Sequence, residues 1–178
     1  MRRLMLCVLG LVAVLVLAPT AAVADSATHT YKLVMEGPNF GVAPNGDQIT
    51  ITGEGEFSVH PDSVEASGTF IHTSSSGTVL ATGTWDATEL IDYQSYGCGV
   101  VFGQTIPSNF CGGVVRMAVT LHTPNGDLPG ILSVICVIGD HAPGAVSGPR
   151  TEGVTLNVIG IINFNHSAGG ENRYEQTS

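Results

Sequence analysis

Residues 48–72 read QITITGEGEFSVHPDSVEASGTFIH, and they give the clearest indication of the fold because apolar and polar side chains alternate through both halves. A period of two is typical of a β-strand with one buried face. Pro61 and Asp62 mark a turn between the halves. The stretch therefore predicts an antiparallel hairpin. The residues expected to face inward are Ile49, Ile51, Gly53, Gly55, Phe57, Val59, Val64, Ala66, Gly68, Phe70 and His72.

The same alternation continues on both sides of this hairpin, whereas helical periodicity is nearly absent after residue 24. We predict about eight strands, at 29–35, 48–59, 63–72, 78–86, 88–96, 114–122, 131–138 and 154–164. Short connections make neighbouring strands antiparallel. The fold class is therefore all-β, a single antiparallel domain. We favour a small closed or nearly closed barrel over a two-sheet sandwich, because closure leaves no exposed sheet edge.

The glycines are the feature that favours the barrel. Inward residues must pair with inward residues, which places Gly53 opposite Gly68 and, across the next turn, Gly68 opposite Gly83. Glycine weakens a strand interior, so a row across three strands needs a reason. In one interpretation the glycines let the sheet coil and aromatic rings cover them. In the other they leave a ligand pocket. The residues of that pocket would be Gly53, Gly68, Gly83, Trp85, Phe57, Phe70 and, at the barrel mouth, His72.

This pattern over residues 29–164 resembles the calycin type of small β-barrel, which includes lipocalin-like carriers and the allene oxide cyclase and dirigent barrels. The resemblance is one of architecture. None of the motifs that define those families is present, so it implies no functional residue here.

Both ends of the chain differ from its middle. Arg2 and Arg3, the apolar run from Leu4 to Ala18 and the small residues before Asp25 predict a cleavable signal peptide over residues 1–24. The run is shorter than the roughly 20 residues that span a bilayer, and no later segment is long and apolar enough to do so. We expect a secreted or extracytoplasmic protein with its β-domain at 25–166. The polar segment 167–178 is expected to be disordered.

The charge balance limits the partners. The net charge is −9, and loss of Arg2 and Arg3 makes it −9 − 2 = −11. Nucleic-acid binding needs clustered Lys and Arg, so we expect no nucleic-acid partner. The sequence does not predict an oligomeric state.

Three cysteines follow the signal peptide. Cys98 and Cys111 flank a loop that contains Pro107 and Asn109, and we predict a disulfide between them. Cys136 lies within a predicted apolar strand, where a buried, inert thiol is expected. The Asn125-Gly126 turn predicts a register that places Val115 opposite Cys136.

No catalytic or metal-binding motif stands out, and no cofactor is expected. The histidines show no metal-ligand spacing, and Asp86, Glu89 and Asp92 are interpreted as a solvated acidic face. The leading hypothesis is a non-enzymatic exported protein that binds a small apolar ligand or a surface partner. One alternative is a cyclase or isomerase that uses the barrel cavity. The other is a structural or surface-interaction protein with a filled core.

Overall fold

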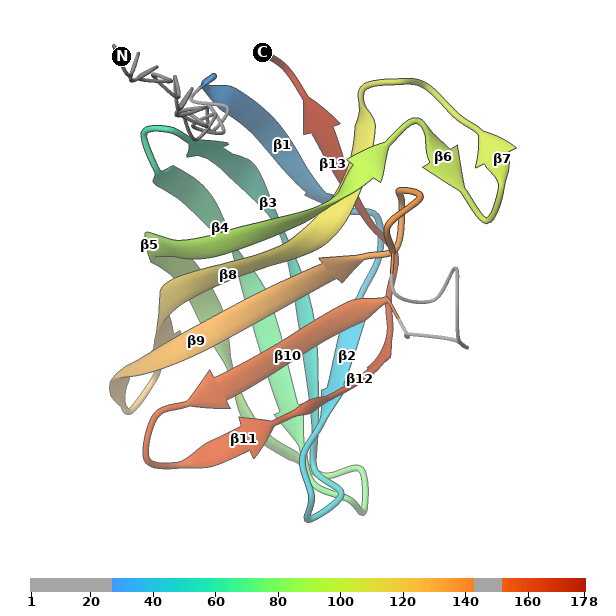
Figure 1. Cartoon of the computed structure of the whole chain (residues 1–178). Helices are drawn as coiled ribbons and strands as arrows, with labels where there is room; N and C mark the ends of the chain where they lie inside the picture. Colours follow the sequence, from blue (N-terminus) through green and yellow to red (C-terminus); the bar gives the residue numbers. More distant parts are fainter. Residues whose placement is uncertain (1–26, 143–151) are drawn as a thin grey trace, which may run out of the picture.

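The computed structural model describes residues 27–142 and 152–178. The predicted signal peptide lies outside these residues. Every regular element in the described part is a β-strand, as predicted (Figure 1). The strands are β1 His29–Met35, β2 Asn39–Val42, β3 Gln48–Val59, β4 Ser63–Thr73, β5 Val79–Cys98, β6 Val100–Val101, β7 Gln104–Thr105, β8 Phe110–Thr123, β9 Gly126–Cys136, β10 Gly153–Val158, β11 Ile162–Phe164, β12 His166–Gly169 and β13 Asn172–Gln176.

Backbone hydrogen bonds close a ring through six antiparallel strands, in the order β1, β3, β4, β5, β8, β13 and back to β1. β9, β10 and β11 continue the sheet from β8, whereas β2 and β12 lie beside the first half of β3. Figure 1 shows the strongly curved sheet that results. The architecture is barrel-like, with ring closure at the end that holds β1 and β13.

Three strand predictions need correction. Segments 78–86 and 88–96 form one long strand, β5, which has three bulges. The first bulge, between Ala87 and Glu89, lies where the two predicted strands were separated. Segment 154–164 is the β10–β11 hairpin, whose turn contains Gly160 at φ +75°. The short strand β2 was not predicted. In contrast, β1 and β3 have the predicted bounds.

The prediction of a disordered tail at 167–178 is wrong. β13 pairs with β1 over five residues and with the start of β8, so it completes the ring. Tyr174 of β13 is fully buried, and its hydroxyl donates to the Val134 carbonyl at 2.8 Å. The buried residues of this segment are Ser167, Asn172 and Tyr174, two of which are polar, so its composition did not indicate burial.

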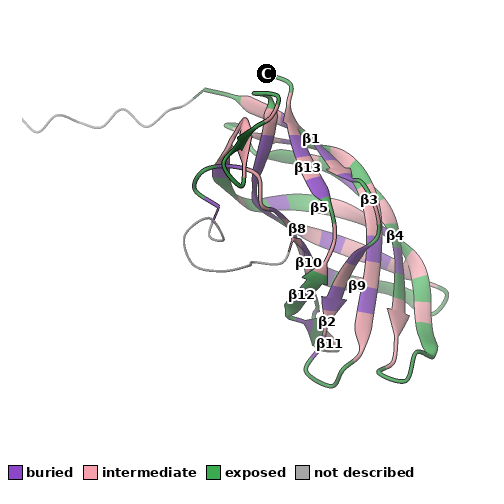
Figure 2. Ribbon diagram, turned by 90° about the vertical axis from the view of Figure 1, so that its right-hand side faces the viewer, coloured by how far each residue is buried: buried purple, intermediate pink, exposed green. Residues whose placement is uncertain are grey.

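The core lies on the inward faces of the curved sheet, which Figure 2 shows as buried bands along the strands. Its largest fully buried side chains are Trp85, Tyr174, Phe57 and Phe164. The predicted β8–β9 register is wrong by two residues, since Val115 pairs with Val134 and Cys136 pairs with Gly113. The turn uses Pro124 and Asn125, one position earlier than expected. A two-residue shift keeps the same face inward, so the predicted burial of the strands is unaffected.

Candidate functional site

The predicted glycine row is only partly formed. Gly53 pairs with Gly68 across β3 and β4, as predicted. Gly83, however, pairs with Phe70, and Gly68 pairs with Trp85. Residues Ser74 to Thr78 connect β4 to β5, one residue more than the predicted register allows, and a bulge opposite His72 and Thr73 adds another. Together they move the register by two residues. The three glycines are therefore staggered across three neighbouring strands.

Aromatic rings and backbone occupy the space that the glycines vacate. A Cβ atom at Gly53 would lie 2.5 Å from the Trp85 ring, and one at Gly83 would lie 2.9 Å from the Phe70 ring. The Trp85 indole N–H also donates to the Thr52 carbonyl at 3.0 Å. At Gly68 a Cβ would overlap the Thr52 carbonyl oxygen. The geometry matches the first interpretation of the glycines, in which rings cover bare backbone.

Phe57 lies in a separate aromatic cluster at the other end of the core. Its ring centroid is 5.0 Å from that of Tyr31, 4.9 Å from that of Tyr93 and 5.5 Å from that of Tyr174. Offset and edge-on arrangements at these distances are favourable packing. The structure therefore separates Phe57 from Phe70, Trp85 and His72. Tyr174 escaped the sequence analysis because it lies in the polar tail.

His72 does lie at the mouth of a cavity. The cavity measures about 60 Å³ and reaches inward at the end that carries the β8–β9 and β10–β11 turns. The His72 ring lies edge-on to Phe164 at 5.1 Å, and its Nε2 is 3.2 Å from the Asp47 carboxylate. The other lining residues are Ile49, Phe70, Ala81, Leu121, Thr123, Leu128, Val158, Ile161, Ile162 and Phe164.

Large aliphatic side chains surround this apolar mouth. Val79 and Leu80 at the start of β5 are 57% and 55% exposed, and Ile161 in the β10–β11 turn is 63% exposed. A second, more open hollow beside Val79 and Leu80 shares Ala81, Thr123 and Leu128 with the cavity. The two hollows therefore adjoin at this end of the molecule, and aliphatic side chains line much of both.

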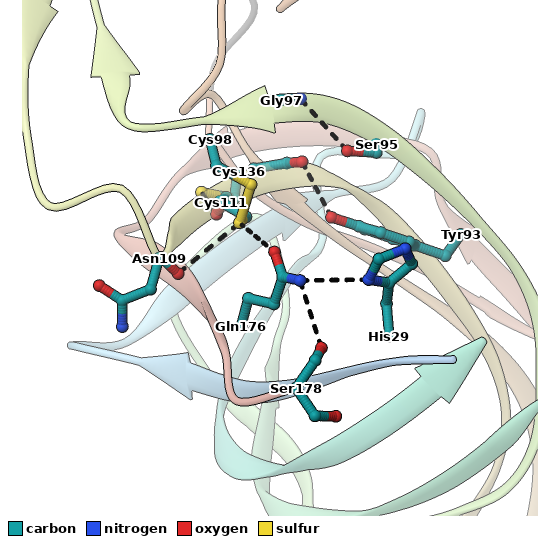
Figure 3. Close-up of a disulfide and its surroundings, with 11 residues drawn as sticks. His29, Tyr93, Ser95, Gly97, Cys98, Asn109, Cys111, Cys136, Gln176 and Ser178 are labelled. Atoms are coloured by element: carbon teal, nitrogen blue, oxygen red, sulfur yellow. Dashed lines mark hydrogen bonds between the residues drawn. A yellow bond between two sulfur atoms is a disulfide. The ribbon is translucent and has the colours of Figure 1, made fainter. Parts of the chain in front are cut away.

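The opposite end of the molecule carries the disulfide and a projecting hairpin. Cys98 and Cys111 face each other across β5 and β8 and are bonded, as predicted. Figure 3 shows Gln176 of β13 between this disulfide and His29 of β1. Strands β6 and β7, which follow Cys98, form a separate two-stranded hairpin that stands off the main sheet (Figure 1). The disulfide therefore closes the base of this hairpin.

Cys136 is a buried free thiol, as predicted. Its sulfur lies 3.6 Å from the carbonyl oxygen of Cys111, close to the disulfide, which was not predicted. Burial, with the nearby Glu152 carboxylate as a smaller contribution, raises the pKa of Cys136 to about 12. Cysteine reacts as the thiolate, so this thiol is inert in the folded protein.

Beside the hairpin lies a hollow of about 340 Å³ that the sequence analysis did not identify. Phe102, Phe110, Glu36, Glu152, Glu171 and Arg173 are among its lining residues. Arg173 is ion-paired with Glu36 and with Glu175, and its guanidinium lies 4.6 Å from the Phe110 ring centroid. Desolvation, followed by the charge of Glu171, raises the pKa of Glu152 to about 7, although Glu152 accepts a hydrogen bond from the Asn172 backbone N–H.

The predicted acidic face is held by ion pairs on the outside of the sheet. Asp92 pairs with Arg116 at 2.9 Å. Asp86 and Asp127 bind opposite nitrogens of His122, and the hydrogen bond to Asp86, followed by that to Asp127, raises the pKa of His122. Across residues 27–142 and 152–178, no three His, Cys, Asp or Glu side chains are grouped so that they could hold a metal ion. In the same residues, no helix could span a membrane.

Comparisons with models of protein families, with curated proteins and with solved structures found no match for this chain.

Proposed function

We propose that this chain is an exported, non-enzymatic binding protein that works through its outer surface and leaves its filled core unchanged. Export is supported by the predicted signal peptide and by the Cys98–Cys111 disulfide, since disulfides persist in oxidising compartments. The observation that carries the proposal is the packing of Trp85 and Phe70 over Gly53 and Gly83. Pockets for small molecules usually measure about 300–1,000 Å³. The cavity that reaches this packing measures about 60 Å³.

The exposed apolar side chains support the same proposal. Phe102 and Ile161 are 77% and 63% exposed, and both lie in turns between strands. Side chains of this size contribute little to folding when solvent surrounds them, whereas they contribute strongly to binding when a partner covers them. Hairpin turns on a rigid sheet are suitable places for such contacts.

Trp85 is the single tryptophan, so its fluorescence reports on the core directly. We would titrate the protein with N-phenylnaphthylamine, a neutral apolar fluorophore that accepts energy from tryptophan. We expect no saturable quenching of Trp85, because the rings leave the probe no room. The Phe70→Ala variant is the control, since its enlarged cavity should admit the probe. Saturable quenching at one probe per wild-type chain would contradict the filled-core proposal.

A second candidate function has its own observation, the apolar mouth around His72. There the protein would hold the end of a small apolar ligand, with the His72–Asp47 pair as the polar contact. Ala81 lines both hollows at this end, so Ala81→Leu should displace such a ligand, whereas Thr84→Leu on the outer face of β5 should not. Native mass spectrometry of protein from its own source would detect the ligand. Its absence from the wild-type protein would remove this candidate.

A further inference from the structure

The β6–β7 hairpin is held rigidly at its base. The Cys98–Cys111 bond joins the two chains that lead into and out of it. Gly99 N–H donates to the Phe110 carbonyl at 2.9 Å, and Gly139 N–H donates to the Val100 carbonyl at 2.7 Å. A preorganised element loses less conformational entropy when it binds a partner. The hairpin is therefore fixed in place although it stands clear of the sheet (Figure 1).

Phe102 at the hairpin tip contributes little to folding. Its side chain is 77% exposed, and its backbone has φ +48°. It forms a two-residue turn with Gly103, which has φ +78°. Asn, Asp and Gly are preferred at such a position because a bulky residue with positive φ is strained. Because folding does not favour phenylalanine at position 102, we explain its presence by a contact with another molecule. Aromatic residues often anchor interfaces.

The hollow beside Phe102 has a surplus of acidic groups. Three carboxyl groups line it, those of Glu36, Glu152 and Glu171, against the single guanidinium of Arg173. Glu152, with a pKa of about 7, is partly protonated at neutral pH, and a cation beside it would favour its charged form. That guanidinium is already shared between Glu36 and Glu175. Glu152 and Glu171 thus have no cation paired with them within the described residues that line the hollow. Charge complementarity calls for a cationic partner.

We propose that the Phe102 tip and this acidic hollow together dock a basic peptide segment of another protein. Phe102 packs against an aliphatic side chain of the segment, and Glu152 and Glu171 accept hydrogen bonds from a lysine or arginine. Phe110 provides an aromatic face beside them, as it already does for Arg173. This inference deepens the surface-binding function proposed above and rests on it.

The test selects binders from a library of short random-sequence peptides against the immobilised mature chain. Enriched peptides should combine Lys or Arg with aliphatic residues. Their affinity is then measured by calorimetry on the wild type and on variants. Phe102→Asn suits the positive φ of the turn, so it should fold at least as well as the wild type and yet weaken binding more than tenfold. Ile159→Asn is the matched control, because Ile159 is 51% exposed in the β10–β11 turn and lines neither this hollow nor the apolar mouth, and it should bind normally.

The charge contribution has its own pair of variants. Glu171→Gln should weaken binding about threefold at low salt and less at high salt, because exposed charges are screened. Glu65→Gln removes the same charge from the outer face of β4 and should change nothing. Enrichment without Lys or Arg, or wild-type affinity of Phe102→Asn, would overturn the proposal. Self-association of the wild type that is abolished in Phe102→Asn would also overturn the proposal, because the partner would then be a second copy of this chain. The Trp85 quenching assay tests the filled core independently, so failure of the peptide-docking proposal can be distinguished from failure of the filled-core proposal.

Discussion

The indole ring of Trp85 lies over the backbone of Gly53, two strands away in the ring of six. Its N–H donates to the carbonyl of Thr52, the residue before that glycine. The indole ring thereby fills the space that a side chain at Gly53 would occupy. Its N–H group finds a hydrogen-bond acceptor at the same position. This pairing is the reason that glycines on the inward face leave a filled core.

Gly68 should not tolerate even a methyl group. A Cβ there would overlap the Thr52 carbonyl oxygen on β3, and backbone cannot move aside as a flexible side chain can. We expect Gly68→Ala to lower the free energy of unfolding by about 1–3 kcal/mol, the usual range for overpacking. Urea denaturation measures the loss. Gly37→Ala is the control, because no atom lies within 4 Å of a Cβ at that position. Equal stabilities of the two variants would contradict the close approach of β3 and β4.

Removal of β13 should unfold the protein. Residues 172–178 supply the buried Tyr174 and the strand that joins β1 to β8. Without them the ring opens and two strand edges lose their partners. We expect the truncated chain to lose near-ultraviolet circular dichroism and cooperative melting, whereas a chain that lacks only residues 177–178 should keep both. Cooperative melting of the longer truncation would show that ring closure is dispensable.

The Cys98–Cys111 bond should stabilise the fold measurably. The two cysteines are 13 residues apart, and a loop of that size corresponds to about 3 kcal/mol in the chain-entropy description. We expect the variant with both Cys98→Ser and Cys111→Ser to have a free energy of unfolding about 3 kcal/mol lower than that of the wild type. Cys136 should react with iodoacetamide only after denaturation, because it is fully buried. Rapid alkylation of Cys136 in the folded protein would be inconsistent with this burial.

Glu152 should make stability depend on pH. Its pKa rises from the ordinary 4.5 to about 7 in the folded protein, mainly through desolvation. The folded state therefore binds the proton more tightly than the unfolded state does. The resulting stabilisation is complete below pH 4.5 and is lost as the pH rises through 7.

The Glu152→Gln variant tests this dependence, since its amide oxygen can still accept from Asn172 N–H. It should match the wild type below pH 4.5 and exceed its stability above pH 7. Glu54→Gln, on the exposed face of β3, should follow the wild-type profile. Thermal melting across this pH range measures both variants. If the stabilities of the wild type and Glu152→Gln changed in parallel with pH, Glu152 would not be the source of the pH dependence.

The site was less accessible to sequence analysis than the fold. His72 was predicted from local properties to face inward near a strand end, and it lines a small cavity. The hollow beside Phe102 joins residues from the segment after β1, the hairpin, β8, the segments between β9 and β10, and the C-terminal strand with the residue before it. No local pattern links residues so distant in sequence. The polar composition of residues 167–178 also concealed Asn172 and Tyr174, whose burial depends on the neighbours that β13 acquires.

The strand class, the inward faces, the first hairpin register and the Cys98–Cys111 bond were all predictable from the amino-acid sequence. Each of these follows from a period of two, from a short turn or from a small set of cysteines. In contrast, three features became known from the folded arrangement: Gly83 pairs with Phe70, β13 closes the ring, and aromatic rings cover Gly53 and Gly83. The physical reason is that a shift of two residues keeps every side chain on its face, so alternation cannot distinguish one register from the next. Whether an inward glycine leaves a pocket depends on the strand register, because the register determines which aromatic ring lies over that glycine.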